Sequence, residues 1–227
     1  MISFRLIACT VALSAVSACG SSQFASRNAP FELIPGDNFD QVTPAVAVAP
    51  EAQLQNLPAM KLASYAIKVP QDLTVSEANL YYPIADIVWR GDPIGDRKDQ
   101  IGYIFQEAVT RTRTQITEGR PVIAEIELER FHSVTEKTRY SVGGTHSISF
   151  FLTLRDAETG QPLVNNKRIK SDLNAFGGRR AIEAERQGFT MKERILSHLN
   201  RVLAAELNQD GGWTNPDPKI EQAINAI

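Results

Sequence analysis

The sequence is poor in the residues that carry most catalytic and metal chemistry. Its 227 residues include two cysteines and three histidines, too few for a disulfide framework or a cysteine-rich zinc site. It also lacks a GxSxG nucleophile elbow, a P-loop and a dinucleotide-binding fingerprint. We therefore predict that the protein is not an enzyme and uses no cofactor and no metal.

Runs of one charge and long apolar runs are missing as well. The 24 basic and 26 acidic residues give a net charge of −2, and no basic block marks a nucleic-acid partner. No apolar run approaches the roughly 20 residues that a membrane-spanning helix needs. With 43% hydrophobic residues, the chain is predicted to form one globular domain that only its N-terminus brings to a membrane.

The N-terminus carries a secretory signal pattern. Residues 1–5 include a positive charge, residues 6–16 are apolar and uncharged, and the tripeptide VSA at 16–18 comes directly before Cys19. This end resembles the lipobox of bacterial lipoproteins, in which the signal is cut before the cysteine and the cysteine is acylated. The resemblance implies that 1–18 is removed and that Cys19 is the lipidated first residue. The alternative is an apolar N-terminal helix with two buried cysteines.

Residues 19–60 are predicted to be a flexible tether, because prolines and serines punctuate them without a sustained hydrophobic period. The alternative is that Phe31, Leu33 and Ile34 pack on the domain as an irregular arm. Gly20 stands where inner-membrane lipoproteins of enteric bacteria have Asp. The resemblance therefore implies anchoring in the outer membrane, with the domain in the periplasm.

Hydrophobic periodicity predicts the folded domain over residues 61–210 and a loose tail over 211–227. After the capping residue Asp96, apolar residues recur at helical spacing. After Pro121, apolar and polar residues alternate, so that alternate side chains would face a core and face water. The predicted elements are strands at 65–69 and 84–90, a helix at 97–118, three strands forming a meander between Pro121 and Leu173, and a helix at 188–207.

This order predicts an α+β fold: an antiparallel sheet of about five strands with two amphipathic helices packed on one face. The architecture is similar to the small periplasmic α+β domains of many proteobacterial lipoproteins, including uncharacterised families and auxiliary lipoproteins of envelope lipid-transport systems. Those likenesses imply an envelope protein and leave its partner open.

The candidate catalytic and metal residues are few. His132 and His146 are expected near the facing ends of two paired strands, where they bind a transition metal if Glu129 or Glu136 adds a carboxylate, or else are solvated. His198 is expected on the surface. The glutamates at 125, 127 and 129 alternate along one strand, which indicates a water-facing surface rather than a glycosidase pair.

Two further stretches are candidate binding sites. The loop FGGRR places Arg179 and Arg180 beside two glycines, as a phosphate or carboxylate site or as a plain strand-to-helix turn. The stretch 80–89 gathers Tyr81, Tyr82 and Trp89, as a contact surface for a protein, glycan or lipid partner or as core.

Three functions are compatible with these features. The leading one is a lipid-anchored envelope protein with a non-catalytic binding or adaptor domain. The alternatives are an accessory lipoprotein of an envelope lipid or solute transport system, and a periplasmic hydrolase.

Overall fold

The computed structural model describes residues 59–208 and 210–215. The predicted signal, the predicted lipidation site Cys19 and nearly all of the predicted tether lie outside the described residues. Among the described residues, none of the helices has the length and apolar character needed to cross a bilayer.

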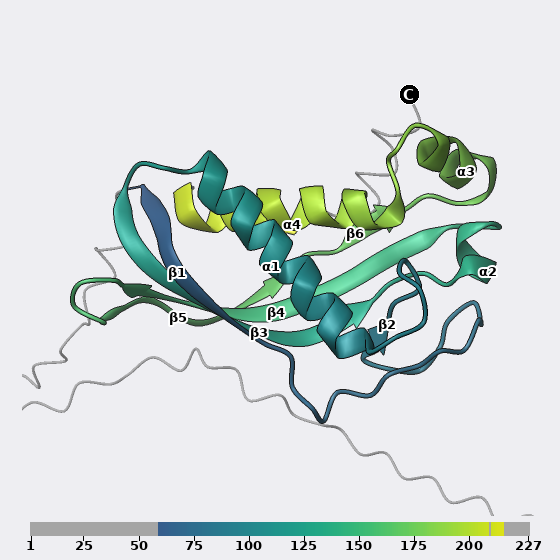
Figure 1. The fold of residues 1–227 in the computed structure, drawn as a ribbon, viewed down its shortest axis with the longest axis horizontal. Helices are drawn as coiled ribbons and strands as arrows, with labels where there is room; N and C mark the ends of the chain where they lie inside the picture. Colours follow the sequence, from purple (N-terminus) through teal and green to yellow (C-terminus); the bar gives the residue numbers. More distant parts are fainter. Residues whose placement is uncertain (1–58, 209, 216–227) are drawn as a thin grey trace, which may run out of the picture. The chain divides into compact units, whose positions relative to one another are not determined.

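The described chain is an α+β domain, as predicted, with six strands in one sheet (Figure 1). In chain order its elements are β1 (Met60–Lys68), β2 (Ile87–Val88), α1 (Arg97–Gln115), β3 (Arg120–His132), α2 (Glu136–Arg139), β4 (Gly144–Asp156), β5 (Pro162–Lys170), β6 (Leu173–Ala175), α3 (Gly178–Arg186) and α4 (Met191–Asn208).

The sheet is mixed, which corrects the expectation of a purely antiparallel one. The predicted meander is present, because β4 runs antiparallel to both β3 and β5. However, β1 pairs parallel with β3, with Leu62 opposite Val122. The chain leaves β1 and returns through helix α1 before it enters β3, and such a crossover brings the second strand back in the direction of the first.

Each edge of the sheet consists of two strands in succession. β1 and β2 both pair with β3, and β5 and β6 both pair with β4. The predicted strand over 84–90 is therefore reduced to two residues, and the single strand expected from Pro162 to Leu173 is divided at Ser171.

One face of the sheet is covered by α1 and α4 (Figure 1). The alternating residues predicted to face the core are buried, and Phe105 of α1 packs its ring edge-to-face against Phe131 and Phe150. The other face carries cross-strand ion pairs: Lys68–Glu127, Arg155–Glu125 and Arg168–Glu129. The three glutamates thus lie on the water side, as their alternation indicates.

The predicted helices are confirmed with small changes of length, and two more are present. Asp96 caps α1 by accepting hydrogen bonds from the backbone N–H groups of Lys98 and Asp99, at 2.8 and 3.1 Å. The short helix α2 was not predicted, and α3 was anticipated only as the segment that a strand-to-helix turn at FGGRR would enter. They lie together at one end of the sheet (Figure 1), where Arg139 of α2 forms an ion pair with Glu185 of α3.

Candidate functional site

The loop over residues 80–84, which leads into β2, is held to the domain by its backbone carbonyls. The hydroxyl groups of Thr135 and Thr138 donate to the carbonyl oxygens of Leu80 and Tyr81, at 2.7 and 2.9 Å. His132 Nε2 lies 2.8 Å from the carbonyl oxygen of Pro83. All three partners are buried. The loop therefore has a fixed backbone although it contains no regular structure.

Residues on either side of the 80–84 loop brace it further. The Asp86 carboxylate accepts hydrogen bonds from the hydroxyl and the backbone N–H of Thr74, at 2.7 and 2.9 Å. These bonds hold the pKa of Asp86 below its usual value. The backbone N–H of Lys137 donates to Asn79 Oδ1 at 2.9 Å. Both ends of the loop are thus tied to the domain.

The side chains of the 80–84 loop point outward as a result. Pro83 is buried, while Leu80, Tyr81 and Tyr82 are 54, 55 and 68% exposed and Ile84 is 96% exposed. Apolar side chains grouped on one ordered loop are typical of an interaction surface. We call this group the Tyr82 surface, made of Leu80, Tyr81, Tyr82 and Ile84.

The two tyrosine rings are held in place. The Tyr82 ring stacks on the His132 ring, with centroids 4.6 Å apart. Its hydroxyl accepts a hydrogen bond from Arg130 Nη2 at 3.1 Å. Lys137 Nζ lies 4.6 Å from the centre of the Tyr81 ring, within cation–π range. Since the rings are already ordered, a partner loses little side-chain entropy on contact.

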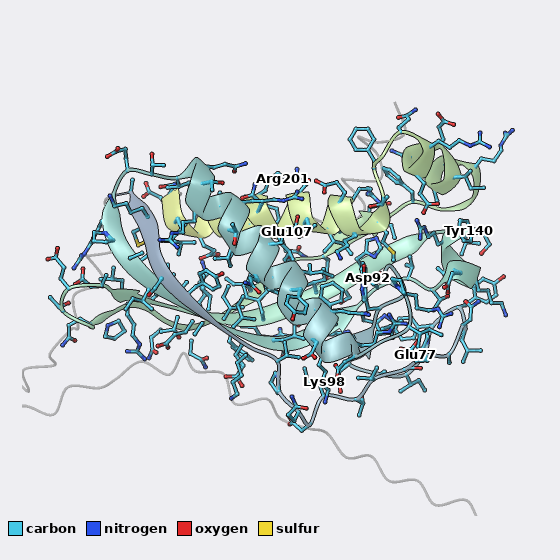
Figure 2. All side chains as sticks on the ribbon, viewed as in Figure 1. Glu77, Asp92, Lys98, Glu107, Tyr140 and Arg201 are labelled. Carbon is cyan, nitrogen blue, oxygen red and sulfur yellow. The ribbon has the colours of Figure 1, made fainter. Side chains whose placement is uncertain are left out.

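A buried arginine links this region to the loop before α1. Arg97 Nε and Nη2 donate to the Glu77 carboxylate at 2.5 and 2.9 Å, and Nη1 donates to the carbonyl oxygens of Asp92 and Pro93 at 3.1 Å. The Arg97 hydrogen bond holds the pKa of Glu77 below its usual value. Figure 2 shows Glu77 and Asp92 at this end of the molecule. Ile94, in the loop so held, is 92% exposed.

Trp89 does not belong to this surface: of the two alternatives for residues 80–89, contact surface or core, Trp89 fits the core, which corrects its place among the candidate binding residues. Its side chain is 0% exposed, its ring packs edge-to-face on Phe131, and its Nε1 donates to the Asp92 carboxylate at 2.8 Å. Sequence reasoning missed Leu80 and Ile84 instead. The alternation with two apolar neighbours was the available signal for Ile84, which lies between Pro83 and Ala85, both of which face inward. No such signal marks Leu80, because Asn79 and Tyr81 on either side of it are both exposed.

The FGGRR loop is a strand-to-helix turn that also borders an open depression. α3 begins at Gly178, and Arg179 and Arg180 are both exposed. The guanidinium carbon of Arg180 lies 4.1 Å from the centre of the Phe176 ring. Arg180 and Phe176 line a depression of about 430 Å³, whereas Arg179 does not line it. The two arginines therefore differ in what they face.

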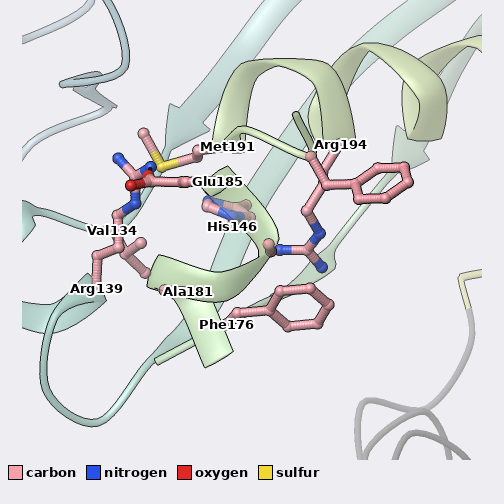
Figure 3. A pocket seen from close by; sticks show the side chains of 10 residues that line it. Val134, Arg139, His146, Phe176, Ala181, Glu185, Met191 and Arg194 are labelled. Atoms are coloured by element: carbon pink, nitrogen blue, oxygen red, sulfur yellow. Dashed lines mark ion pairs between the residues drawn. The ribbon is translucent and has the colours of Figure 1, made fainter. Parts of the chain in front are cut away.

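The hydroxyl of Ser133 and the ring of His146 form a buried pair. Ser133 Oγ lies 2.8 Å from His146 Nδ1 and donates to Met191 Sδ at 3.2 Å. The tautomer of His146 decides which of the two groups donates in this pair. Burial lowers the pKa of His146 to about 3. The cavity beside the ring (Figure 3) holds about 10 Å³, room for at most one water. The pair thus joins β3, β4 and the start of α4 inside the domain.

The histidines do not form the metal site considered above. His132 is opposite Ser147 in the sheet, so His146, one residue away, points to the other face. Glu129 and Glu136 are ion-paired with Arg168 and Arg90. The part of the chain that the structure describes holds no group of three or more metal-binding side chains. The expectation that the histidines are solvated is also wrong, because both are buried.

His198 is buried as well, which corrects its expected place on the surface. It is 0% exposed and packs edge-to-face against Trp213, with ring centroids 5.3 Å apart. Burial lowers its pKa to about 4. Trp213 also donates from Nε1 to the carbonyl oxygen of Lys170 at 3.0 Å. The start of the predicted tail is therefore in contact with α4 and β5.

Comparison with known proteins gives a family and two distant structures. The model of DUF6778, a family of unknown function, matches residues 60–223. The crystal structure of a "putative lipoprotein" from Caulobacter crescentus is 15% identical in sequence and has a TM-score of 0.28. The match covers 62% of this chain and 86% of the Caulobacter chain. A DUF330 protein from Xanthomonas campestris is 10% identical in sequence and has a TM-score of 0.37. The match covers 65% of this chain and 83% of the Xanthomonas chain. No curated protein matches the sequence.

Proposed function

The chain belongs to the DUF6778 family, and we propose that it is a lipid-anchored cell-envelope protein whose domain binds a partner protein through the Tyr82 surface, without catalysing a reaction. The observation that carries this proposal is the backbone fixation of the 80–84 loop. Buried hydroxyls and an imidazole hold its carbonyls inward, and the apolar side chains are presented to solvent.

The chemistry of the surface favours a protein partner. Tyrosine and arginine are enriched at protein interfaces, and here Tyr82 lies beside Arg130 while Tyr81 lies beneath Lys137. Leu80 and Ile84 supply apolar area next to these rings. We therefore propose a partner patch that is apolar at its centre and acidic at its rim.

The anchoring part of the proposal rests on the sequence before the described domain. The lipobox-like end at Cys19 places acyl chains at the first mature residue, and the predicted tether lets the domain reach a partner away from the lipid surface. Intact mass and detergent partitioning of the protein from its native envelope, beside Cys19→Ala, test this part. A soluble, unacylated wild type contradicts it.

The binding part is tested by photo-crosslinking in the native envelope, with a crosslinking residue at Ile84 and a control at Val142. Both side chains are well exposed, at 96 and 77%, and Val142 lies outside the Tyr82 surface. We expect a product at position 84 that is absent at 142 and is lost when Tyr82→Ser is added. Equal products at both positions contradict the proposal.

A second candidate function is that of an accessory lipoprotein in envelope lipid or solute transport. The observation that favours it is a groove of about 460 Å³ between β1 and α1, lined by side chains that include Tyr65, Ile67, Val69 and Tyr103. Co-purification with transporter subunits supports this function. Crosslinking from Tyr103, which is 68% exposed, then distinguishes the groove from the Tyr82 surface as the contact.

A further inference from the structure

Strand β1 forms one edge of the sheet and pairs only with β3 in the part of the chain that the structure describes (Figure 1). Backbone N–H and C=O groups of alternate β1 residues therefore point away from β3, where no described strand lies. The pairing with β3 has one register shift, between Leu62 and Ser64, so the edge is regular over residues 64–68. A regular edge of this kind can pair with a further strand.

The opposite edge of the sheet is protected against such pairing. The register of β5 with β4 shifts twice, and Asn166 of β5 has a positive φ of 48°. Trp213 Nε1 donates to the carbonyl oxygen of Lys170 in β5 at 3.0 Å. Irregular geometry and a covering segment are two of the means by which sheet edges avoid pairing. Over residues 64–68 the β1 edge has neither of them among the described residues.

The groove between β1 and α1 lies beside this edge. Tyr65 and Ile67 of β1 and Tyr103 of α1 are among its lining residues, and Tyr103 is 68% exposed. A strand added to β1 would place side chains over these residues as well as bonding the backbone edge. Covering them removes apolar surface from water, which favours association.

The side of α1 that borders the groove has an acidic residue at one end and a basic residue at the other. Asp99 lies in the first turn of α1 and Arg113 in the last. Their separation of about four helical turns puts them on the same side of the helix, and both are exposed. Among the described residues, α1 forms ion pairs through Arg97, Glu107 and Arg111, and not through Asp99 or Arg113.

This charge pattern is complementary to itself. Gln106, which is exposed and lines the groove, lies midway between Asp99 and Arg113. A two-fold axis beside Gln106 reverses the direction of a second α1, so Asp99 of each copy lies opposite Arg113 of the other. The same axis makes the two β1 strands antiparallel, the direction in which strands of two copies pair about a two-fold axis.

We propose that a second copy of this chain adds to the sheet at β1, forming a symmetric dimer with one continuous sheet and with Asp99 and Arg113 paired between the two α1 helices. The contact shares no residue with the Tyr82 surface, so its failure leaves the proposed partner binding untouched.

The test is sedimentation of the full chain, extracted from its native envelope in a mild detergent, with the mass corrected for bound detergent. We expect a mass of two chains. Asp99→Arg and Arg113→Asp each place like charges at both contacts, so each should weaken the dimer about tenfold or more. When the two variants are mixed in equal amounts, dimers should form again, because each contact then joins one acidic and one basic group.

Arg186→Asp is the matched control, because Arg186 lies in the last turn of α3 and its side chain is 75% exposed. It should change the dimer affinity by less than about twofold. Hydrogen exchange locates the contact: amides over residues 64–68 should exchange more slowly in the wild type than in Arg113→Asp. A monomeric wild type, a mixture of the two charge variants that stays monomeric, or equal exchange over residues 64–68 in wild type and Arg113→Asp overturns the proposal.

Discussion

The Thr138 hydroxyl donates a 2.9 Å hydrogen bond to the carbonyl oxygen of Tyr81, across 57 residues of sequence. Thr138 is only 6% exposed, while the Tyr81 side chain is 55% exposed. A buried group in α2 therefore sets the direction of an exposed aromatic side chain. The Tyr82 surface depends on several bonds of this kind.

Thr138→Val removes this bond with little change of volume. The Tyr81 carbonyl then loses its partner, so we expect a loss of about 1 kcal/mol in the free energy of unfolding. Amide hydrogen exchange over residues 80–84 should become faster, because local opening costs less. The control is Thr110→Val at an exposed position of α1. The Thr110 hydroxyl donates to the carbonyl oxygen of Gln106 in the same helix. If amide exchange over residues 80–84 in Thr138→Val is as slow as in the wild type, the Thr138 bond does not hold the loop.

Gly91→Ala should destabilise the domain by about 1–3 kcal/mol through overpacking. A Cβ at Gly91 would lie 2.3 Å from Trp89 Cη2, and the indole is fully buried, so it would have to shift within the core. Gly102→Ala is the matched change. In α1 its Cβ would meet only Val69, at 4.0 Å, so it should gain about 0.5–1 kcal/mol of helix propensity. Urea unfolding measures both, and equal effects contradict the packing argument.

The parts of the fold that could be predicted are those with a local pattern. The alternation in β3 and β4 and the helical spacing around Asp96 identify their own elements, so the meander and both long helices follow from sequence. The parallel pairing of Leu62 with Val122 leaves no local mark, because it joins segments 60 residues apart through a helix.

The exposure of the side chains at the candidate site is also not visible in any local sequence pattern. Tyr82 and Trp89 are both aromatic and seven residues apart, and nothing in their spacing says that one is 68% exposed and the other 0%. That difference is set by distant partners, His132 under Tyr82 and Phe131 against Trp89. Similarly, the burial of His198 follows from Trp213, which lies in a segment without periodicity.

Stability should fall as the pH is lowered from 7 to 5. The unfolded His198 takes up a proton near pH 6.5, but the folded residue does so only near pH 4, because burial opposes its charge. Between these values the unfolded state binds more protons, so the free energy of unfolding rises with pH. His146, with a folded pKa of about 3, acts in the same direction.

His198→Asn removes one of these groups. In this variant the slope of unfolding free energy against pH between 6 and 4.5 should be smaller by about 1.4 kcal/mol per pH unit, the value for one proton. Urea unfolding across that range gives the slope, which does not depend on the variant's absolute stability. A slope identical to wild type would show that His198 is not the residue that resists protonation.

Glu206→Gln should cost about 2–3 kcal/mol, because it leaves a charge without its partner at a buried site. The Glu206 side chain is 2% exposed and accepts from Lys167 Nζ at 2.9 and 3.0 Å. It also accepts from the backbone N–H of Trp213 at 2.8 Å. A Gln offers one oxygen and one amide, so at least one of these donors meets another donor.

The control for Glu206 is Glu127→Gln, which breaks the exposed pair with Lys68 and should cost less than about 1 kcal/mol. Urea unfolding gives both values. Iodide quenching adds a local readout, because Trp89 is fully buried and the accessible signal comes from Trp213. We expect Glu206→Gln alone to make Trp213 more accessible. Equal losses of stability in the two variants, or unchanged quenching, would mean that the Lys167–Glu206 pair does not hold the segment after α4 against β5.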